Sequence, residues 1–188
     1  MLNFVVPCAV VSAAAACGSK TRTTGAAEIG GPFQLTDSSG RRVSERLLRG
    51  KWTAIFFGYT SCPDVCPTTL TALGQAVAAL GGKARDLQVV FVTVDPDRDT
   101  PAQLARYLSA ASFPKGTIGL TGSAAQIAAV ARAYRVYYKR VPDGATYSMD
   151  HTAVIYLMDP EGRFNCPVNS SQTPPQIADK IAKAMAAG

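Results

Sequence analysis

The chain has 188 residues, which is enough for one domain preceded by a short leader. Hydrophobic residues make up 47% of it and charged residues 17%, a composition that favours a normal buried core over a disordered chain. The net charge of +6 comes from scattered basic residues, and no nucleic-acid motif is present, so we expect solvated basic faces, with weak attraction to an anionic membrane surface or acidic partner as the alternative.

The first 17 residues are almost wholly apolar or small and carry no charge, which is typical of a targeting segment. The run Ala14-Ala15-Ala16-Cys17 fits signal-peptide cleavage and resembles a bacterial lipobox, in which the cysteine becomes the lipidated first residue. The run is shorter than the roughly 20 apolar residues of a membrane span. We therefore expect an exported lipoprotein anchored at Cys17, with an uncleaved helical anchor as the alternative. Residues 18–28 are predicted to be a flexible tether, and residues 29–188 the folded domain.

Strands and helices are predicted to alternate through the rest of the chain. Apolar, β-branched runs predict core strands at 51–57, 87–94 and 153–158. Capping residues and apolar periodicity predict helices at 68–80, 101–111, 123–134 and 174–187. A Pro-Asp-Gly turn between 136–141 and 146–149 predicts a hairpin. The pattern indicates an α/β three-layer domain with a central β-sheet flanked by helices.

Two cysteines stand where the first core strand gives way to a helix. Pro67 suits the first turn of that helix, so Cys62 and Cys66 lie at or just before its N-terminus. Unpaired backbone N–H groups and the helix dipole favour thiolate over thiol there. Such a pair can form a disulfide, attack one, or hold a soft metal ion. Three residues separate the cysteines, one more than in redox thioredoxins, which leaves room for a metal between the sulfurs.

The only histidine, His151, lies directly before the third core strand. Loops at one edge of such a sheet gather ligands, so we expect its imidazole to join the cysteines. Two thiolates and one imidazole favour Cu(I), tolerate Cu(II) and could take Zn(II) with a water. Asp150 is either a partner that orients the imidazole or a turn carboxylate.

Two further groups of residues invite a functional interpretation. The acidic loop 95–99 lacks the glycine and bidentate glutamate of a calcium loop, so it is interpreted as a solvated loop with a local Arg–Asp pair. Asp95 is the exception, since it follows a core strand and is expected at the edge that carries the cysteines. Cys166 is interpreted as a small apolar filler, with an additional thiol role as the alternative.

Three blocks of sequence together resemble the Sco/SenC family, namely residues 56–67 (FFGYTSCPDVCP), 92–101 (VTVDPDRDTP) and 150–160 (DHTAVIYLMDP). The resemblance implies a thioredoxin-like fold with a mixed central sheet. It implies one copper ion bound through Cys62, Cys66 and His151. It also implies a role in assembling the binuclear copper centre of cytochrome c oxidase, with subunit II or another copper acceptor as partner, and anchoring to a membrane on its periplasmic side.

Two functions follow from these residues. The first is a copper-binding metallochaperone that passes its ion to a partner by ligand exchange. The second is a thiol–disulfide oxidoreductase that uses Cys62 and Cys66 as a redox-active pair to reduce the cysteines of copper-site proteins. A peroxiredoxin-like peroxidase is set aside, because the proline and threonine that precede its reactive cysteine are absent from both cysteines here.

Overall fold

The computed structural model describes residues 29–188, which fold around a seven-stranded sheet. The predicted leader, residues 1–17, and the predicted tether, residues 18–28, lie outside the described residues. The strand order is β2-β1-β5-β4-β3-β8-β9, and a separate two-stranded sheet contains β6 and β7. The strands are β1 (Gln34–Asp37), β2 (Arg42–Ser44), β3 (Trp52–Gly58), β4 (Leu87–Thr93), β5 (Ile118–Thr121), β6 (Tyr138–Asp143), β7 (Thr146–His151), β8 (Val154–Met158) and β9 (Phe164–Asn169).

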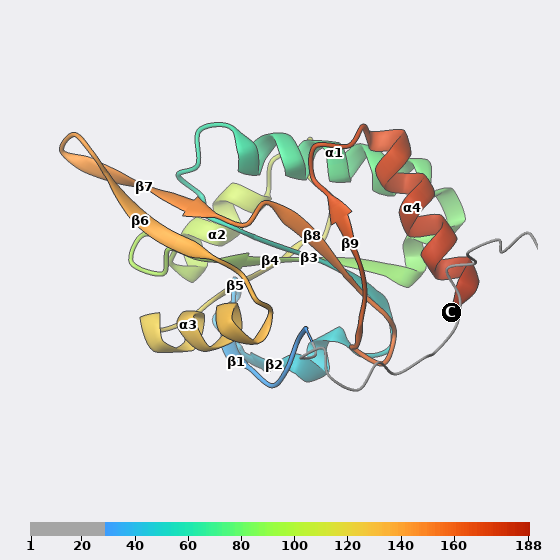
Figure 1. Ribbon diagram of the computed structural model, residues 1–188, viewed down its shortest axis with the longest axis horizontal. Helices are drawn as coiled ribbons and strands as arrows, with labels where there is room; N and C mark the ends of the chain where they lie inside the picture. The colour runs from blue at the N-terminus through green and yellow to red at the C-terminus, as the bar shows by residue number, and fades with distance from the viewer. Residues whose placement is uncertain (1–28) are drawn as a thin grey trace, which may run out of the picture.

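Four α-helices cover the sheet on both faces (Figure 1), namely α1 (Val65–Ala79), α2 (Pro101–Leu108), α3 (Ala124–Ala133) and α4 (Pro174–Ala187). Short 3-10 helices precede β3 at Glu45–Leu48 and β4 at Gly81–Asp86. On one face, Phe91 of β4 packs against Tyr107 of α2, and on the other Phe57 of β3 packs against Tyr134 at the end of α3. The predicted three-layer α/β architecture is confirmed. No helix among residues 29–188 has the length and apolar character needed to cross a membrane.

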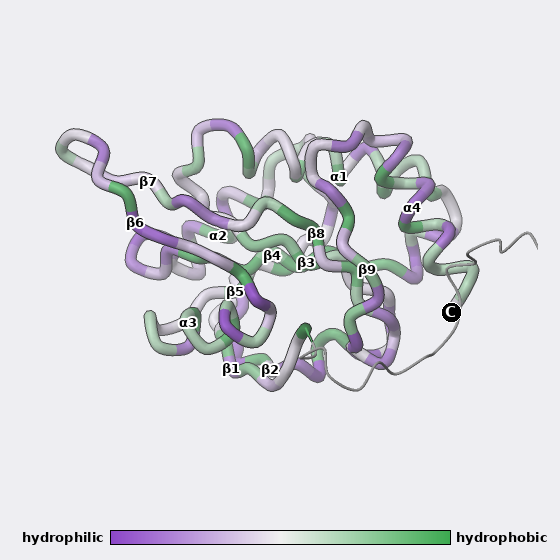
Figure 2. Tube along the Cα trace, viewed as in Figure 1, coloured by the Kyte–Doolittle hydropathy of each residue, from purple (hydrophilic) through white to green (hydrophobic). Residues whose placement is uncertain are grey.

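The centre of the sheet contains the strands that the sequence predicts most strongly. β3 is buried along its whole length, as expected for a strand covered by helices on both faces, and Figure 2 shows the central strands largely in the green of hydrophobic residues. β3 runs parallel to β4 and antiparallel to β8, so the sheet is mixed. Because β8 is antiparallel to β3, the start of β8 lies beside the end of β3. This register brings the segment before β8 to the edge where the cysteines lie.

Several element boundaries differ from the sequence prediction. Helix α1 begins at Val65, three residues earlier than predicted, so Cys66 and Pro67 lie inside its first turn. Helix α2 ends at Leu108 instead of near Ala111. The short strands β1, β2, β5 and β9 were not predicted, because they have three to six residues and little hydrophobic periodicity. The predicted hairpin is present as β6 and β7, and it extends away from the helices in Figure 1.

Candidate metal centre

The two thiols meet at the junction between β3 and α1. Cys66, in the first turn of α1, is fully buried, whereas Cys62 in the preceding loop is half-buried. The backbone N–H of Cys66 donates to the sulfur of Cys62 at 3.4 Å. Gly58, the last residue of β3, makes room for this arrangement, since a Cβ there would lie 2.8 Å from the Cys66 sulfur. A side chain at position 58 would therefore displace the buried thiol.

His151 approaches the thiols from the end of β7. Its Nε2 lies 3.5 Å from the Cys66 sulfur, and its Nδ1 lies 3.2 Å from the carbonyl oxygen of Thr152. Because a carbonyl oxygen only accepts, Nδ1 carries the hydrogen and Nε2 turns its lone pair toward the sulfur. The rings of Phe56 and Tyr59 stand edge-on to the imidazole, with centroids 6.1 and 5.8 Å away. The imidazole is thus held in the tautomer and orientation that a metal ligand requires.

One ligand atom each from Cys62, Cys66 and His151 lies within 4.8 Å of the other two. Within residues 29–188, this is the one group of three or more such side chains that could hold a metal ion. Two sulfurs and one imidazole nitrogen form a soft donor set, which suits Cu(I), tolerates Cu(II) and could take Zn(II) with a water. The sequence prediction that these three residues gather at one edge of the sheet is confirmed, and their role as ligands stays a prediction.

The pKa values of the two thiols are shifted in opposite directions, because the thiols share a hydrogen bond. Donation by the Cys66 thiol lowers the pKa of Cys62 to about 3, and hydrogen bonds from the backbone N–H groups of Cys66 and Asp64 lower it further, against the effect of burial. The same bond and burial raise the pKa of Cys66. At neutral pH the pair therefore holds one thiolate, on Cys62, and one proton, on Cys66. Binding a metal through both sulfurs releases that proton.

The buried carboxylate of Asp99 holds the cysteine loop through hydrogen bonds to Thr60. Asp99 is fully buried and accepts hydrogen bonds from the backbone N–H of Thr60 at 3.0 Å, the Thr60 hydroxyl at 2.6 Å and the Thr93 hydroxyl at 2.6 Å. Burial raises the pKa of Asp99, while the hydrogen bonds from Thr60 and Thr93 oppose that rise. The sequence analysis missed this function, although the position of Asp99 just before a capped helix is a signal that could have suggested it.

The acidic loop 95–99 is only partly as predicted. The predicted local pair is confirmed, since Arg98 forms an ion pair with Asp95. The interpretation of a solvated loop is wrong for Asp99, which is fully buried, as is Asp95, the predicted exception. Asp95 follows β4 at the expected edge of the sheet, where the hydroxyl of Tyr147 donates to it at 2.8 Å. It lies outside the group of donor atoms that could hold a metal.

The two remaining candidate residues, Asp150 and Cys166, lie outside the group of donor atoms that could hold a metal. Asp150 is exposed and next to His151 in β7, so the two side chains point to opposite faces of the strand. The carbonyl of Thr152, rather than Asp150, faces Nδ1 of the imidazole. Cys166 is half-buried in β9, opposite Leu157 of β8, and packs against the core, as expected of a small filler.

Comparison with known proteins gives one consistent family. The family model described as SCO1/SenC matches residues 21–186. The Arabidopsis thaliana protein "SCO1 homolog 1, mitochondrial" is 46% identical over 144 residues, which are 76% of this chain and 42% of that protein. The chain thus spans less than half the length of this relative.

Solved structures agree with the same family. The copper-bound structure of Bradyrhizobium japonicum ScoI is 50% identical, with a TM-score of 0.76 over 83% of this chain and 99% of that one. The copper-bound structure of Arabidopsis thaliana ScoI is 41% identical, with a TM-score of 0.80 over 84% of this chain and 98% of that one. The thioredoxin-like fold that the sequence resemblance implies is confirmed.

Proposed function

Because the chain belongs to the SCO1/SenC family, we propose that it is a copper-binding metallochaperone that assists assembly of the binuclear copper centre of cytochrome c oxidase. It carries one copper ion, held by Cys62, Cys66 and His151, to subunit II of the oxidase or to another copper acceptor. The observation that carries the proposal is the set of three soft donor atoms within 4.8 Å of one another. The copper-bound structures of similar proteins support copper over zinc as the cargo.

The burial of the three donors suits a carrier that must also release its cargo. Cys62 is half-buried and ionised, so it is the sulfur that an incoming ion or an acceptor's ligand reaches first. Cys66 is fully buried and keeps its proton until a metal displaces it. His151 is half-exposed and offers its Nε2 lone pair. Transfer then proceeds by exchanging one ligand at a time from the exposed side.

An anaerobic copper titration of the reduced protein tests this function. We expect one copper per chain by metal analysis, with binding weakened and the Cu(II)–thiolate absorption altered in His151→Ala. Cys166→Ser is the matched control, since it removes a cysteine outside the site and is expected to bind like the wild type. Absence of tight copper binding would refute the proposal. Copper binding that is indifferent to His151 would reduce the site to two thiolates.

The ionised Cys62 also favours a second candidate, a thiol–disulfide oxidoreductase. Its thiolate would attack a disulfide of a copper-site protein, forming a mixed disulfide and releasing one target thiolate. Cys66, after losing its proton, would then attack Cys62 of the mixed disulfide, which leaves an oxidised Cys62–Cys66 pair and a fully reduced target. Incubating the metal-free protein with an oxidised dithiol peptide tests this. Stoichiometric reduction that is lost in Cys66→Ser would support it, and no reduction would exclude it.

The apolar run before Cys17 supports export of the protein and attachment to a membrane. The proposed place is the periplasmic side of the cell membrane, reached by export and held by a lipid on Cys17. Growth with a labelled fatty acid, followed by mass analysis of the mature protein, tests this. We expect label on the wild type and none on Cys17→Ala. Membrane retention of unlabelled, uncleaved protein would instead indicate a helical anchor.

A further inference from the structure

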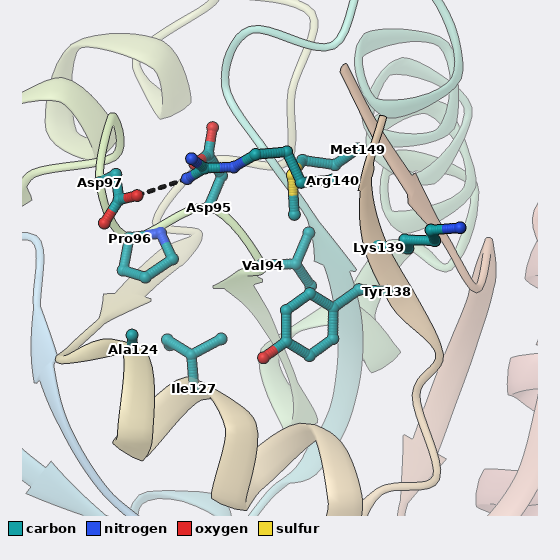
Figure 3. A pocket seen from close by; sticks show the side chains of 10 residues that line it. All are labelled: Val94, Asp95, Pro96, Asp97, Ala124, Ile127, Tyr138, Lys139, Arg140 and Met149. Atoms are coloured by element: carbon teal, nitrogen blue, oxygen red, sulfur yellow. Dashed lines mark hydrogen bonds and ion pairs between the residues drawn. The ribbon is translucent and has the colours of Figure 1, made fainter. Parts of the chain in front are cut away.

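The hairpin that ends in His151 is joined to the domain in an unusual way. Among the described strands, β6 and β7 pair only with each other, apart from the seven-stranded sheet. A hollow of about 320 Å³ lies between the hairpin residues Tyr138 and Met149 and Ile127 of α3 (Figure 3). The hairpin is therefore not fixed by pairing with the main sheet, and the hollow leaves part of its contact with α3 open, although the Met149 side chain is buried. Its position relative to the thiols depends on other contacts along β7.

Several of those contacts involve Arg98, in the loop between β4 and α2. Its Cζ lies 3.8 Å from the ring centroid of Tyr147 in β7, and its Nη1 donates to the Tyr147 carbonyl oxygen at 3.0 Å. Its Nε pairs with the buried carboxylate of Asp95, to which the Tyr147 hydroxyl also donates at 2.8 Å. Arg98 and Asp95 together contact the ring, the hydroxyl and the backbone of one hairpin residue.

The same guanidinium also lies near the cysteine loop. Its Cζ lies 5.7 Å from the ring centroid of Tyr59, the residue that directly follows β3. The carbonyl of Tyr59 accepts from the N–H of Cys62 at 3.3 Å, and its ring stands perpendicular to the imidazole of His151. The Arg98 side chain is only 26% exposed, and cation–π contacts strengthen as the cation leaves water. Arg98 thus joins an aromatic ring of the cysteine loop to one of the hairpin.

We propose that Arg98 is a positioning residue of the metal site. It holds β7 beside Tyr59 and thereby keeps the imidazole of His151 against Cys66, without itself binding the metal. A lysine cannot replace it fully, because the planar guanidinium stacks on a ring while donating in two other directions. The inference rests on the proposed function in taking copper as the metal, but the position of the imidazole can be measured in the metal-free protein.

Arg140 of β6 provides a matched control. Its Cζ lies 4.0 Å from the ring centroid of the same Tyr147, and it forms an ion pair with Asp97 (Figure 3). The side chains of this pair are 52% and 63% exposed, and exposed ion pairs contribute little to stability. Arg140→Met therefore removes a guanidinium from the same tyrosine without leaving a buried carboxylate unpaired.

The first measurement uses nuclear magnetic resonance on the reduced, metal-free whole chain. His151 is the only histidine, so its ring resonances are identified directly, and its cross-peaks to the Tyr59 ring report their distance. We expect shifted resonances and weaker cross-peaks in Arg98→Lys and Arg98→Met, and wild-type values in Arg140→Met. Arg98→Lys keeps a cation beside the buried carboxylate of Asp95 and is therefore expected to fold. This variant provides the test if Arg98→Met does not fold. Wild-type ring resonances in folded Arg98→Lys would overturn the proposal.

The second measurement follows the release of copper to a chelator. We expect Arg98→Lys to bind one ion per chain but to release it about tenfold faster than the wild type. Its Cu(II) spectrum should move toward that of His151→Ala, and Arg140→Met should match the wild type. If the wild type binds no copper, the proposed function is refuted. The ring resonances of His151 in the metal-free protein still test whether Arg98 positions the imidazole. A variant that only melts earlier, with an unchanged spectrum, release rate and ring resonances, would show a purely structural role.

Discussion

The two halves of the donor set are held by different means. The thiols lie where β3, paired on both sides by β4 and β8, meets helix α1, and Cys66 is fully buried there. The imidazole stands at the end of a hairpin that pairs outside the main sheet and is half-exposed. The position of the thiols is therefore part of the core. The position of the imidazole depends on a few side-chain contacts.

Because of this difference, mutations near the thiols and mutations near the imidazole are expected to have different effects on stability and on the site. A change near the thiols is expected to reduce the free energy of unfolding, because it disturbs buried atoms at a strand–helix junction. A change near the imidazole is expected to alter the proposed third ligand while the domain stays folded. A carrier benefits from this division, since the sulfurs remain in place while the third ligand is exchanged.

The largest effect expected in the thiol half concerns ionisation. Because the Cys66 thiol donates to Cys62 and lowers its pKa to about 3, Cys62 stays ionised throughout the range from pH 8 to pH 5. Its alkylation by iodoacetamide should keep a constant rate over that range, whereas a thiol with an ordinary pKa near 9 would slow about 1,000-fold. Mass analysis of the metal-free, reduced protein measures the rate at Cys62.

The Cys66→Ala variant is the control for this experiment. It removes the donor that contributes most to the low pKa of Cys62, so a steep dependence of the alkylation rate on pH should appear. A steep dependence already present in the wild type would contradict the shared hydrogen bond. In that case Cys62 would not be ionised at neutral pH, and the thiols would differ from the imidazole only in their burial.

The next largest effect is expected at Gly58. In Gly58→Ala the new Cβ would lie 2.8 Å from the Cys66 sulfur and 3.0 Å from the Phe91 ring, both held in the core. Overpacking of this kind should lower the free energy of unfolding by about 3 kcal/mol, as measured by denaturant titration. Gly82→Ala is the control, because its nearest neighbour is the movable end of Arg85, at 3.3 Å. Equal stability of the two variants would show that the thiol half is not tied to the core.

A smaller loss is expected when the support beneath the cysteine loop is weakened. Asp99→Asn keeps the shape of the side chain but replaces one accepting oxygen by a donor, which faces the N–H and hydroxyl donors of Thr60 and Thr93. We expect a loss of about 2 kcal/mol in the free energy of unfolding. Asp97→Asn, in an exposed pair, should change it by less than about 0.5 kcal/mol. A wild-type value for Asp99→Asn would mean that this network does not support the loop.

How far the sequence predicts the structure also differs between the two halves. The thiol half follows from local signals, namely a buried strand, a glycine and a proline in the first turn of a helix, all of which lie within residues 52–67. The gathering of His151 with the cysteines was predicted as well, because one edge of the sheet collects the relevant loops. The donor set favoured copper but left zinc open, and the family resemblance supplied the reason to choose copper.

The contacts around the imidazole could not be predicted in the same way. The Arg98–Tyr147 contact joins residues 49 positions apart, and the hydrogen bond between Asp99 and Thr60 joins residues 39 apart. Nothing in a run of residues such as 95–99 distinguishes a solvated aspartate from a buried one, because the distinction depends on which distant donors arrive. Local patterns therefore predicted the elements, while the network that positions the ligands appeared only in three dimensions.

The smallest loss of stability is expected from removing the imidazole itself. In the metal-free protein, His151→Ala should lower the free energy of unfolding by only about 1 kcal/mol, since the half-exposed ring makes two edge contacts, with Phe56 and Tyr59. Tyr137→Ala, in which an exposed ring next to the hairpin is removed, should change it by less than about 0.5 kcal/mol. Denaturant titration of both variants measures this. A loss for His151→Ala as large as that for Gly58→Ala would make the imidazole part of the core, and the third ligand could then not be exchanged without disturbing the fold.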